Sequence, residues 1–104
     1  MKTKMFELKR MTIDEFAEEN GLTMEIHERS AIDSPTRFYA NFEGAEISEY
    51  PGLVGAYGNG ATPDEAVDNY AEEISGKLVV IGAYTDGRIE IPVPILMPLN
   101  RREK

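Results

Sequence analysis

A glycine-rich stretch that runs into a helix start, GNGATPDEA at residues 58–66, contains the residue types of a phosphate-binding loop. Glycines let backbone N–H groups approach an anion closely, and the first turn of a helix adds unpaired donors and the positive end of the helix dipole. The same stretch is also an ordinary way to connect a strand to a helix. The residues around it distinguish an anion site from a structural turn.

Those neighbouring residues argue against an anion. Known phosphate-binding motifs place a lysine at the helix start or a third glycine at a fixed spacing. Residues 38–76 contain no basic side chain, and Asp64 and Glu65 occupy the first helical turn, where they would repel a phosphate. Pro63 removes one of the N–H donors. We therefore interpret the glycines as a turn that leads into a helix capped by Thr62.

His27 is the one histidine of the chain, and histidine is the residue type whose ordinary pKa lies closest to neutral. Its place in an alternating pattern predicts that it points away from the core. There is no cysteine, and no serine is obviously paired with the histidine. The sequence also lacks a dedicated calcium-binding loop. We therefore predict a protein that is not an enzyme, with no catalytic residues, no cofactor and no metal.

Acidic residues dominate the central part of the chain. Residues 11–100 contain 4 basic and 17 acidic residues, a net charge of −13, whereas the terminal segments are basic. Such a surface repels nucleic-acid phosphates and attracts basic proteins. Three carboxylates at i, i+3 and i+7 form a ridge on the second predicted helix, and two tyrosines flank the glycine stretch. The candidate partner-binding residues are Glu65, Asp68, Glu72, Tyr50 and Tyr57.

Plainer interpretations of these residues stay open. The carboxylates fit the solvated face of an amphipathic helix, and the same ridge is a weaker candidate for Mg²⁺ or Ca²⁺. The two tyrosines fit an interface, but they fit equally well as anchors of the glycine stretch on a sheet.

Two helices are predicted from caps and apolar spacing. A capping box of Thr12 and Glu15 opens the first helix, and Gly21 ends it. The second helix runs from Pro63 to about Ser75, and Gly76 closes it. Its apolar stripe consists of Ala66, Val67, Tyr70, Ala71 and Ile74.

Five strands follow from alternation and from one continuous apolar run. Alternating residues predict strands near 22–27, 38–43 and 45–49, and the run at 78–81 predicts a central strand buried on both sides. Asp86-Gly87 predicts a two-residue hairpin that returns through residues 88–91. Prolines after that strand place it at a sheet edge.

The resulting class is α+β, in the order α-β-β-β-α-β-β, with the helices on one face of a mainly antiparallel sheet. At 104 residues we expect a single domain. Residues 1–11 form a charged lead-in, residues 12–94 the folded core and residues 95–104 a tail. No signal peptide or membrane-length apolar segment is apparent, so we expect a cytoplasmic protein that does not enter membranes.

Residues 38–74 resemble the HicB-like antitoxin domain. The matching features are the strand FYANFEG, the segment EYPGLVGAYGNGATPDEAVDNY and the helix that follows. The later IPVP at residues 91–94 extends the resemblance to about residues 38–94. The resemblance implies a three-stranded antiparallel sheet followed by a helix and another strand, a degraded RNase H-like core related to double-stranded-RNA-binding domains.

The resemblance also implies a function. Family members neutralise a small basic ribonuclease toxin by covering it, and they commonly self-associate. We therefore expect a bacterial or phage protein that binds a small basic protein, with homo-oligomers as a further possibility and no direct contact with nucleic acid. Only MPLNRREK follows the last predicted strand, so we do not expect the C-terminal DNA-binding domain of many relatives.

Two other functions remain as alternatives. The RNase H-like ancestry suggests the remnant of a metal-dependent hydrolase. The acidic body suggests an acidic mimic of nucleic acid, of phage origin, that blocks a nucleic-acid-binding protein.

Overall fold

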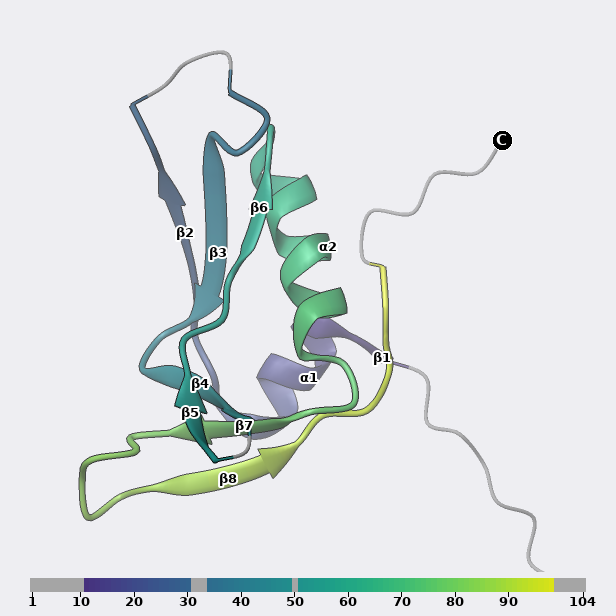
Figure 1. The fold of residues 1–104 in the computed structure, drawn as a ribbon. Helices are drawn as coiled ribbons and strands as arrows, with labels where there is room; N and C mark the ends of the chain where they lie inside the picture. Colours follow the sequence, from purple (N-terminus) through teal and green to yellow (C-terminus); the bar gives the residue numbers. More distant parts are fainter. Residues whose placement is uncertain (1–10, 31–33, 50, 99–104) are drawn as a thin grey trace, which may run out of the picture.

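A computed structural model describes residues 11–30, 34–49 and 51–98 of the chain (Figure 1). Most of the predicted lead-in, the last six residues of the predicted tail and the candidate residue Tyr50 lie outside the described residues. The described part contains two helices, α1 (Ile13–Asn20) and α2 (Pro63–Ile74). Its strands are β1 (Met11–Thr12), β2 (Met24–Glu28), β3 (Phe38–Phe42), β4 (Ala45–Glu49), β5 (Gly52–Val54), β6 (Gly58–Gly60), β7 (Leu78–Ile81), β8 (Ile89–Pro92) and β9 (Leu96–Met97).

These strands form two antiparallel sheets and one short parallel pair. The first sheet has the order β2-β3-β6 and the second the order β5-β4-β7-β8, while β1 pairs with β9 in parallel. The α+β class and the mainly antiparallel pairing are therefore confirmed. The element order differs from the predicted one because β1, β5, β6 and β9 are added to it. These strands have two or three residues each, too few to show a period in the sequence.

The chain passes from one sheet to the other at Gly44. This glycine has a φ of 69°, in the left-handed region that glycine adopts without a steric penalty. It separates β3, in the first sheet, from β4, in the second. Figure 1 shows the first sheet standing beside α2 and the second crossing below it. The single sheet expected from the sequence is therefore divided at this bend.

The start and end of α1 agree with the sequence. The backbone N–H of Thr12 donates to Glu15 Oε1 at 3.0 Å, as a capping box requires. Gly21 follows the helix with a φ of 67°. Ile13 and Phe16 are buried on the inner side of the helix, so a single apolar face holds α1 against the core.

The core lies between α2 and the sheets. All five residues of the predicted stripe on α2 are buried. The ring of Tyr70 meets the ring of Phe42 edge to face, with 5.4 Å between centroids. In β7 the consecutive residues Val79 and Val80 are both fully buried, so the strand is covered on both faces, and β8 lies at the sheet edge as predicted.

Two connections differ from the sequence interpretation. Asp86 and Gly87 do not form a two-residue hairpin: β7 and β8 pair at Ile81 and Ile89, so the whole of residues 82–88 connects them. The start of the predicted tail, residues 95–98, is also structured, since Leu96 is buried and β9 pairs with β1. Within the described residues, no helix has the length and apolar character needed to cross a membrane.

Candidate functional site

The glycine stretch of residues 58–60 is a strand that lies directly against α2. A Cβ added at Gly58 would come within 2.1 Å of the Tyr70 backbone nitrogen. One added at Gly60 would come within 2.4 Å of the Ala66 backbone nitrogen. Neither position has room for a side chain. The glycines therefore permit a close strand–helix contact, and the interpretation of residues 58 and 60 as a turn is replaced by β6.

Two backbone N–H donors near the start of α2 are used within the chain. The N–H of Ala61 donates to Glu65 Oε1 at 2.7 Å, and the N–H of Glu65 donates to Thr62 Oγ1 at 3.1 Å. Thr62 caps the helix, as the sequence predicts. The Glu65 carboxylate accepts its hydrogen bond from Ala61, the residue before the cap. With these amides occupied and two carboxylates in the first turn, this helix start is poorly suited to a phosphate.

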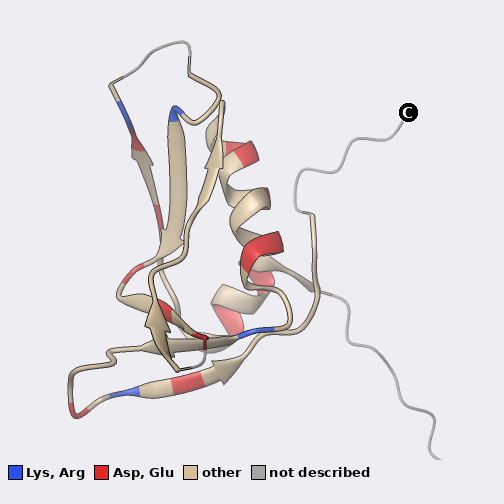
Figure 2. Ribbon diagram, viewed as in Figure 1, with Lys and Arg blue, Asp and Glu red and all other residues tan. Residues whose placement is uncertain are grey.

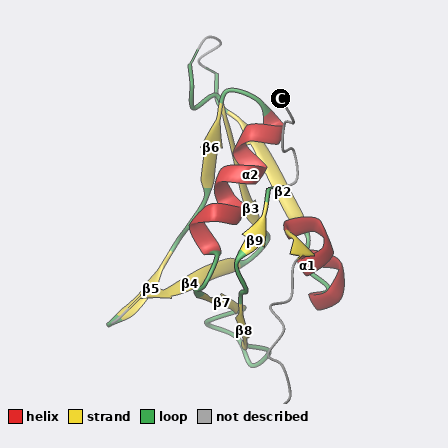
Figure 3. Cartoon of the chain, turned by 90° about the vertical axis from the view of Figure 1, so that its right-hand side faces the viewer, coloured by secondary structure: helices red, strands yellow, loops and turns green. Residues whose placement is uncertain are grey.

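The three carboxylates of the predicted ridge lie in two different environments. Glu65 accepts the hydrogen bond from Ala61 at the start of the helix. Asp68 is half-buried and Glu72 is exposed. Both line a hollow of about 560 Å³ between α2 and the segment of β9, and Figure 3 shows this strand beside the helix. The opposite wall of the hollow is apolar and consists of Ile95, Leu96 and Pro98.

Tyr57 lies apart from this hollow. It meets Tyr39 edge to face at 5.6 Å, on the face of the first sheet that is turned away from α2. On the same face, His27 stacks on Tyr39 at 4.6 Å, and the Arg29 guanidinium lies 4.4 Å from the centre of that ring. Arg29 also donates to Asn59 Oδ1 at 2.9 Å. The structure thus places the candidate carboxylates and Tyr57 on different faces.

Sequence reasoning missed this ring cluster of His27, Arg29, Tyr39 and Tyr57. The alternation of residues 25–29 and 38–42 indicated which side chains share a face. Only the register, in which His27 pairs with Tyr39, brings the rings together. That register joins positions far apart in the sequence, and short alternating segments do not specify it.

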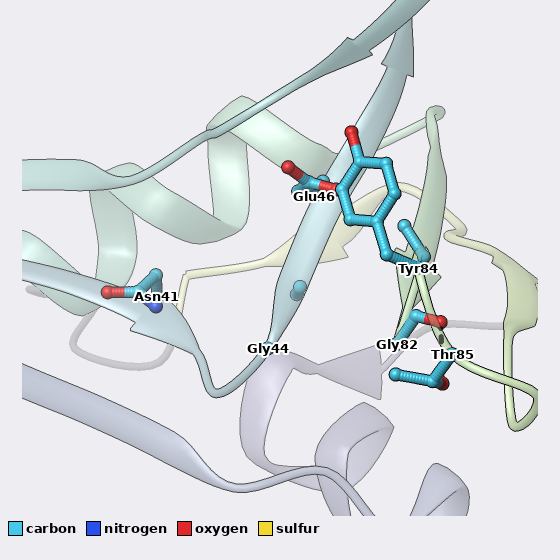
Figure 4. Close-up of a pocket in the computed structure, with 8 residues that line it drawn as sticks. Asn41, Gly44, Glu46, Gly82, Tyr84 and Thr85 are labelled. Carbon is cyan, nitrogen blue, oxygen red and sulfur yellow. Dashed lines mark hydrogen bonds between the residues drawn. The ribbon is translucent and has the colours of Figure 1, made fainter.

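A second hollow, of about 390 Å³, lies at the bend between the sheets (Figure 4). Glu46 is the one ionised side chain among its described lining residues, and Tyr84 stands exposed at its margin. The Thr85 hydroxyl donates to the Gly82 carbonyl oxygen and accepts from the Gly87 N–H, so it is committed to the loop. The hollow therefore lacks a nucleophile paired with a base.

Carboxylates far outnumber cations on the described surface. The described residues include 16 acidic and 4 basic side chains, and the acidic ones lie on both helices and on several strands and loops (Figure 2). Each of the four cations already contacts an acceptor of this chain: Arg29 contacts Asn59, Arg37 contacts Glu28, Lys77 contacts Glu49 and Glu73, and Arg88 contacts Glu90. Carboxylates therefore remain in excess over cations within the described part of the chain.

The interior of the described part of the chain is apolar apart from the phenol of Tyr70. No other polar or charged side chain there is buried, and no three carboxylates or histidines there are grouped to hold a metal. Among the described residues, the clearest pKa shift is that of Tyr70. Burial raises the pKa of its phenol above 10.0, and a hydrogen bond with the Phe42 backbone opposes that effect.

Comparisons of this chain with protein-family models, with curated proteins and with solved structures find no match.

Proposed function

We propose that this chain is a non-enzymatic, HicB-like protein-binding module, an antitoxin or inhibitor that covers a small basic protein such as a ribonuclease-type toxin. The observation that carries the proposal is the excess of carboxylates over cations on the described surface, where each described cation already contacts an acceptor in the chain. A basic partner would neutralise this surplus and would be attracted to it over several ångströms.

The hollow beside α2 gives the proposed contact a centre. Interfaces combine an apolar centre with a polar rim. Here Ile95, 71% exposed, faces the hollow together with Leu96, while Asp68 and Glu72 supply negative charge on the other side. This arrangement favours a partner segment that inserts an apolar side chain next to lysine or arginine. The partner-binding set therefore centres on Asp68 and Glu72, with Glu65 at its margin.

The resemblance to HicB-like domains points to the same function. It implies strands, then a helix opening with Thr-Pro-Asp-Glu-Ala, then another strand, and α2 and β7 follow that order. The family covers its toxins with such a module. Neutralisation by covering requires surface complementarity and no catalytic group, which fits a chain whose described carboxylates lie on the surface.

Capture from the lysate of the source cell, followed by purification of the bound protein, tests this proposal. We expect the chain to retain a small basic protein at about 0.05 M salt and to release it at about 0.5 M, where screening shortens to about 4 Å. The purified partner, if toxic when expressed alone, should lose its toxicity when this chain is co-expressed.

A matched pair of variants locates the contact. Asp68→Lys/Glu72→Lys should abolish binding of the purified partner. Glu43→Lys/Asp86→Lys makes the same change in net charge at exposed positions elsewhere and should preserve most of the binding. Equal losses in both pairs would reduce the contact to general charge attraction. Salt-insensitive binding, or failure to retain any basic protein, would contradict the proposed function.

A further inference from the structure

Among the described strands, β2 is the longest that lies at the edge of a sheet. The other edges are protected by features that limit pairing: β5 and β6 have three residues each and contain glycine, and β8 ends in Pro92. β2 has five residues and neither proline nor glycine. In Figure 1 it forms the outer margin of the first sheet, and none of the labelled elements lies along its outer side.

The hydrogen bonds to β3 show which backbone groups of β2 are unpaired within the sheet. The Arg29 N–H donates to the Arg37 carbonyl at 2.6 Å, and Thr23 accepts from the Glu43 N–H at 2.8 Å. Both pairs belong to the same register as the strand itself, and bonding alternates along an antiparallel pair. The odd-numbered residues of β2 therefore bond to β3. The outward N–H and C=O groups belong to Met24, Ile26 and Glu28.

This edge is complementary to itself. When two copies of β2 lie antiparallel with Ile26 opposite Ile26, the outward backbone groups of both strands meet in hydrogen-bonding positions. Glu25 and His27, which already lie 3.3 Å apart within one chain, also come opposite each other twice in this register, in the closer type of cross-strand pair. Met24 then lies opposite Glu28, so no like charges face each other directly.

Neighbouring registers are less favourable. A pairing centred on Glu25 or on Glu28 would place two carboxylates opposite each other, and a pairing centred on His27 would place two imidazole rings opposite each other. A pairing centred on Met24 would extend the contact into the turn after α1, where Gly21 has a positive φ and the strand has ended. The pairing centred on Ile26 also covers a side chain that is 47% exposed in the single chain.

We infer that two copies of this chain associate through β2, antiparallel and centred on Ile26, and so join their first sheets into one continuous six-stranded sheet. The strand order across the two-fold axis is β6-β3-β2-β2-β3-β6. The contact lies on the sheet edge, separate from the acidic hollow beside α2, so it does not depend on the proposed function. Its short length predicts a reversible dimer rather than a permanent one.

Sedimentation or light scattering of the full chain over about 5 μM to 1 mM tests the dimer. We expect a concentration-dependent mass that reaches twice that of the monomer. Ile26→Lys places two cations opposite each other at the centre and should weaken association by a factor of about 100 or more. Ile89→Lys is the matched control, because Ile89 is 51% exposed on the other long edge, β8, and should leave association unchanged.

A charge exchange tests the register and avoids dependence on a single substitution at the centre. His27→Glu opposes two carboxylate pairs and should weaken association about tenfold. The double variant Glu25→Lys/His27→Glu restores opposite charges across the axis and should recover most of the loss. Circular dichroism would check that each variant is folded.

Three results would overturn the inference. They are a monomer at about 1 mM, a dimer that Ile89→Lys disrupts as strongly as Ile26→Lys, and a double variant no better than His27→Glu alone. A strand supplied by another protein at this edge, without self-association, would also overturn it.

Discussion

The two faces of α2 differ in how tightly their side chains are packed. On the inner face, five apolar side chains are buried and β6 approaches so closely that residues 58 and 60 have no space for a Cβ. On the outer face, Asp68 and Glu72 border an open hollow, and charge rather than shape constrains them. One helix therefore combines a side that tolerates almost no change in volume with a side open to substitution. Stability and partner binding should be separable by mutation.

Gly58→Ala should have the largest effect, because it acts on the inner face. The new Cβ would lie 2.1 Å from backbone of α2, which cannot move aside as the end of a side chain can. We expect a loss of about 3 kcal/mol or more in the free energy of unfolding, measured with urea. Gly52→Ala is the control, since nothing lies within 4 Å of its added Cβ. A small effect of Gly58→Ala would contradict the close contact.

Tyr70→Phe should have an intermediate effect. It keeps the ring against Phe42 and removes the hydroxyl, at a cost of about 1 kcal/mol near neutral pH. Burial raises the pKa of Tyr70 in the folded chain above its ordinary value of 10.0. The unfolded chain therefore loses this proton first as the pH rises, and the wild-type chain should lose stability from pH 10.0 up to the pKa of the folded state.

The phenylalanine variant should lack that part of the alkaline loss. Urea unfolding of both proteins between about pH 8 and pH 11 measures the difference, since the other tyrosines contribute equally to each. Parallel pH profiles would show that the buried phenol does not contribute to the alkaline loss.

Glu72→Gln should have the smallest effect on stability. The side chain is exposed and lies in the last part of α2, where a negative charge opposes the helix dipole. We expect a change within about 0.5 kcal/mol, in the stabilising direction, by thermal unfolding. Binding to the proposed basic partner should nevertheless weaken. A destabilisation above about 1 kcal/mol would place this residue with the inner face.

The sequence was most informative where structure depends on near neighbours. The caps and the apolar period of α2 depend on residues within a few positions of one another, and its start at Pro63 and its buried stripe were predicted correctly. β6 was not predicted as a strand, because Gly-Asn-Gly has low strand propensity and is extended only through its contacts with β3 and α2. The bend at Gly44 likewise depends on two sheets that the local pattern does not distinguish.

The candidate site also combines features that depend on near neighbours with features that depend on distant residues. Glu65 was predicted as a docking residue, but its hydrogen bond with the Ala61 N–H commits the carboxylate to the helix start. The hollow beside α2 also includes Ile95 and Leu96, in a segment that the sequence assigned to the tail. Residues more than twenty positions apart form that surface, so no local pattern could indicate it.

The contact between β6 and α2 also has an evolutionary consequence. Gly58, Gly60 and the fully buried Ala66 lie in one narrow space between β6 and α2. A larger side chain at any of them would therefore change the packing around the other two. Lineages that diverge from this chain should keep all three residues, or exchange them together with a shift of the helix. The spacing of two glycines and an alanine is therefore a fingerprint by which distant descendants of the fold could be traced, even after their surface charges have changed.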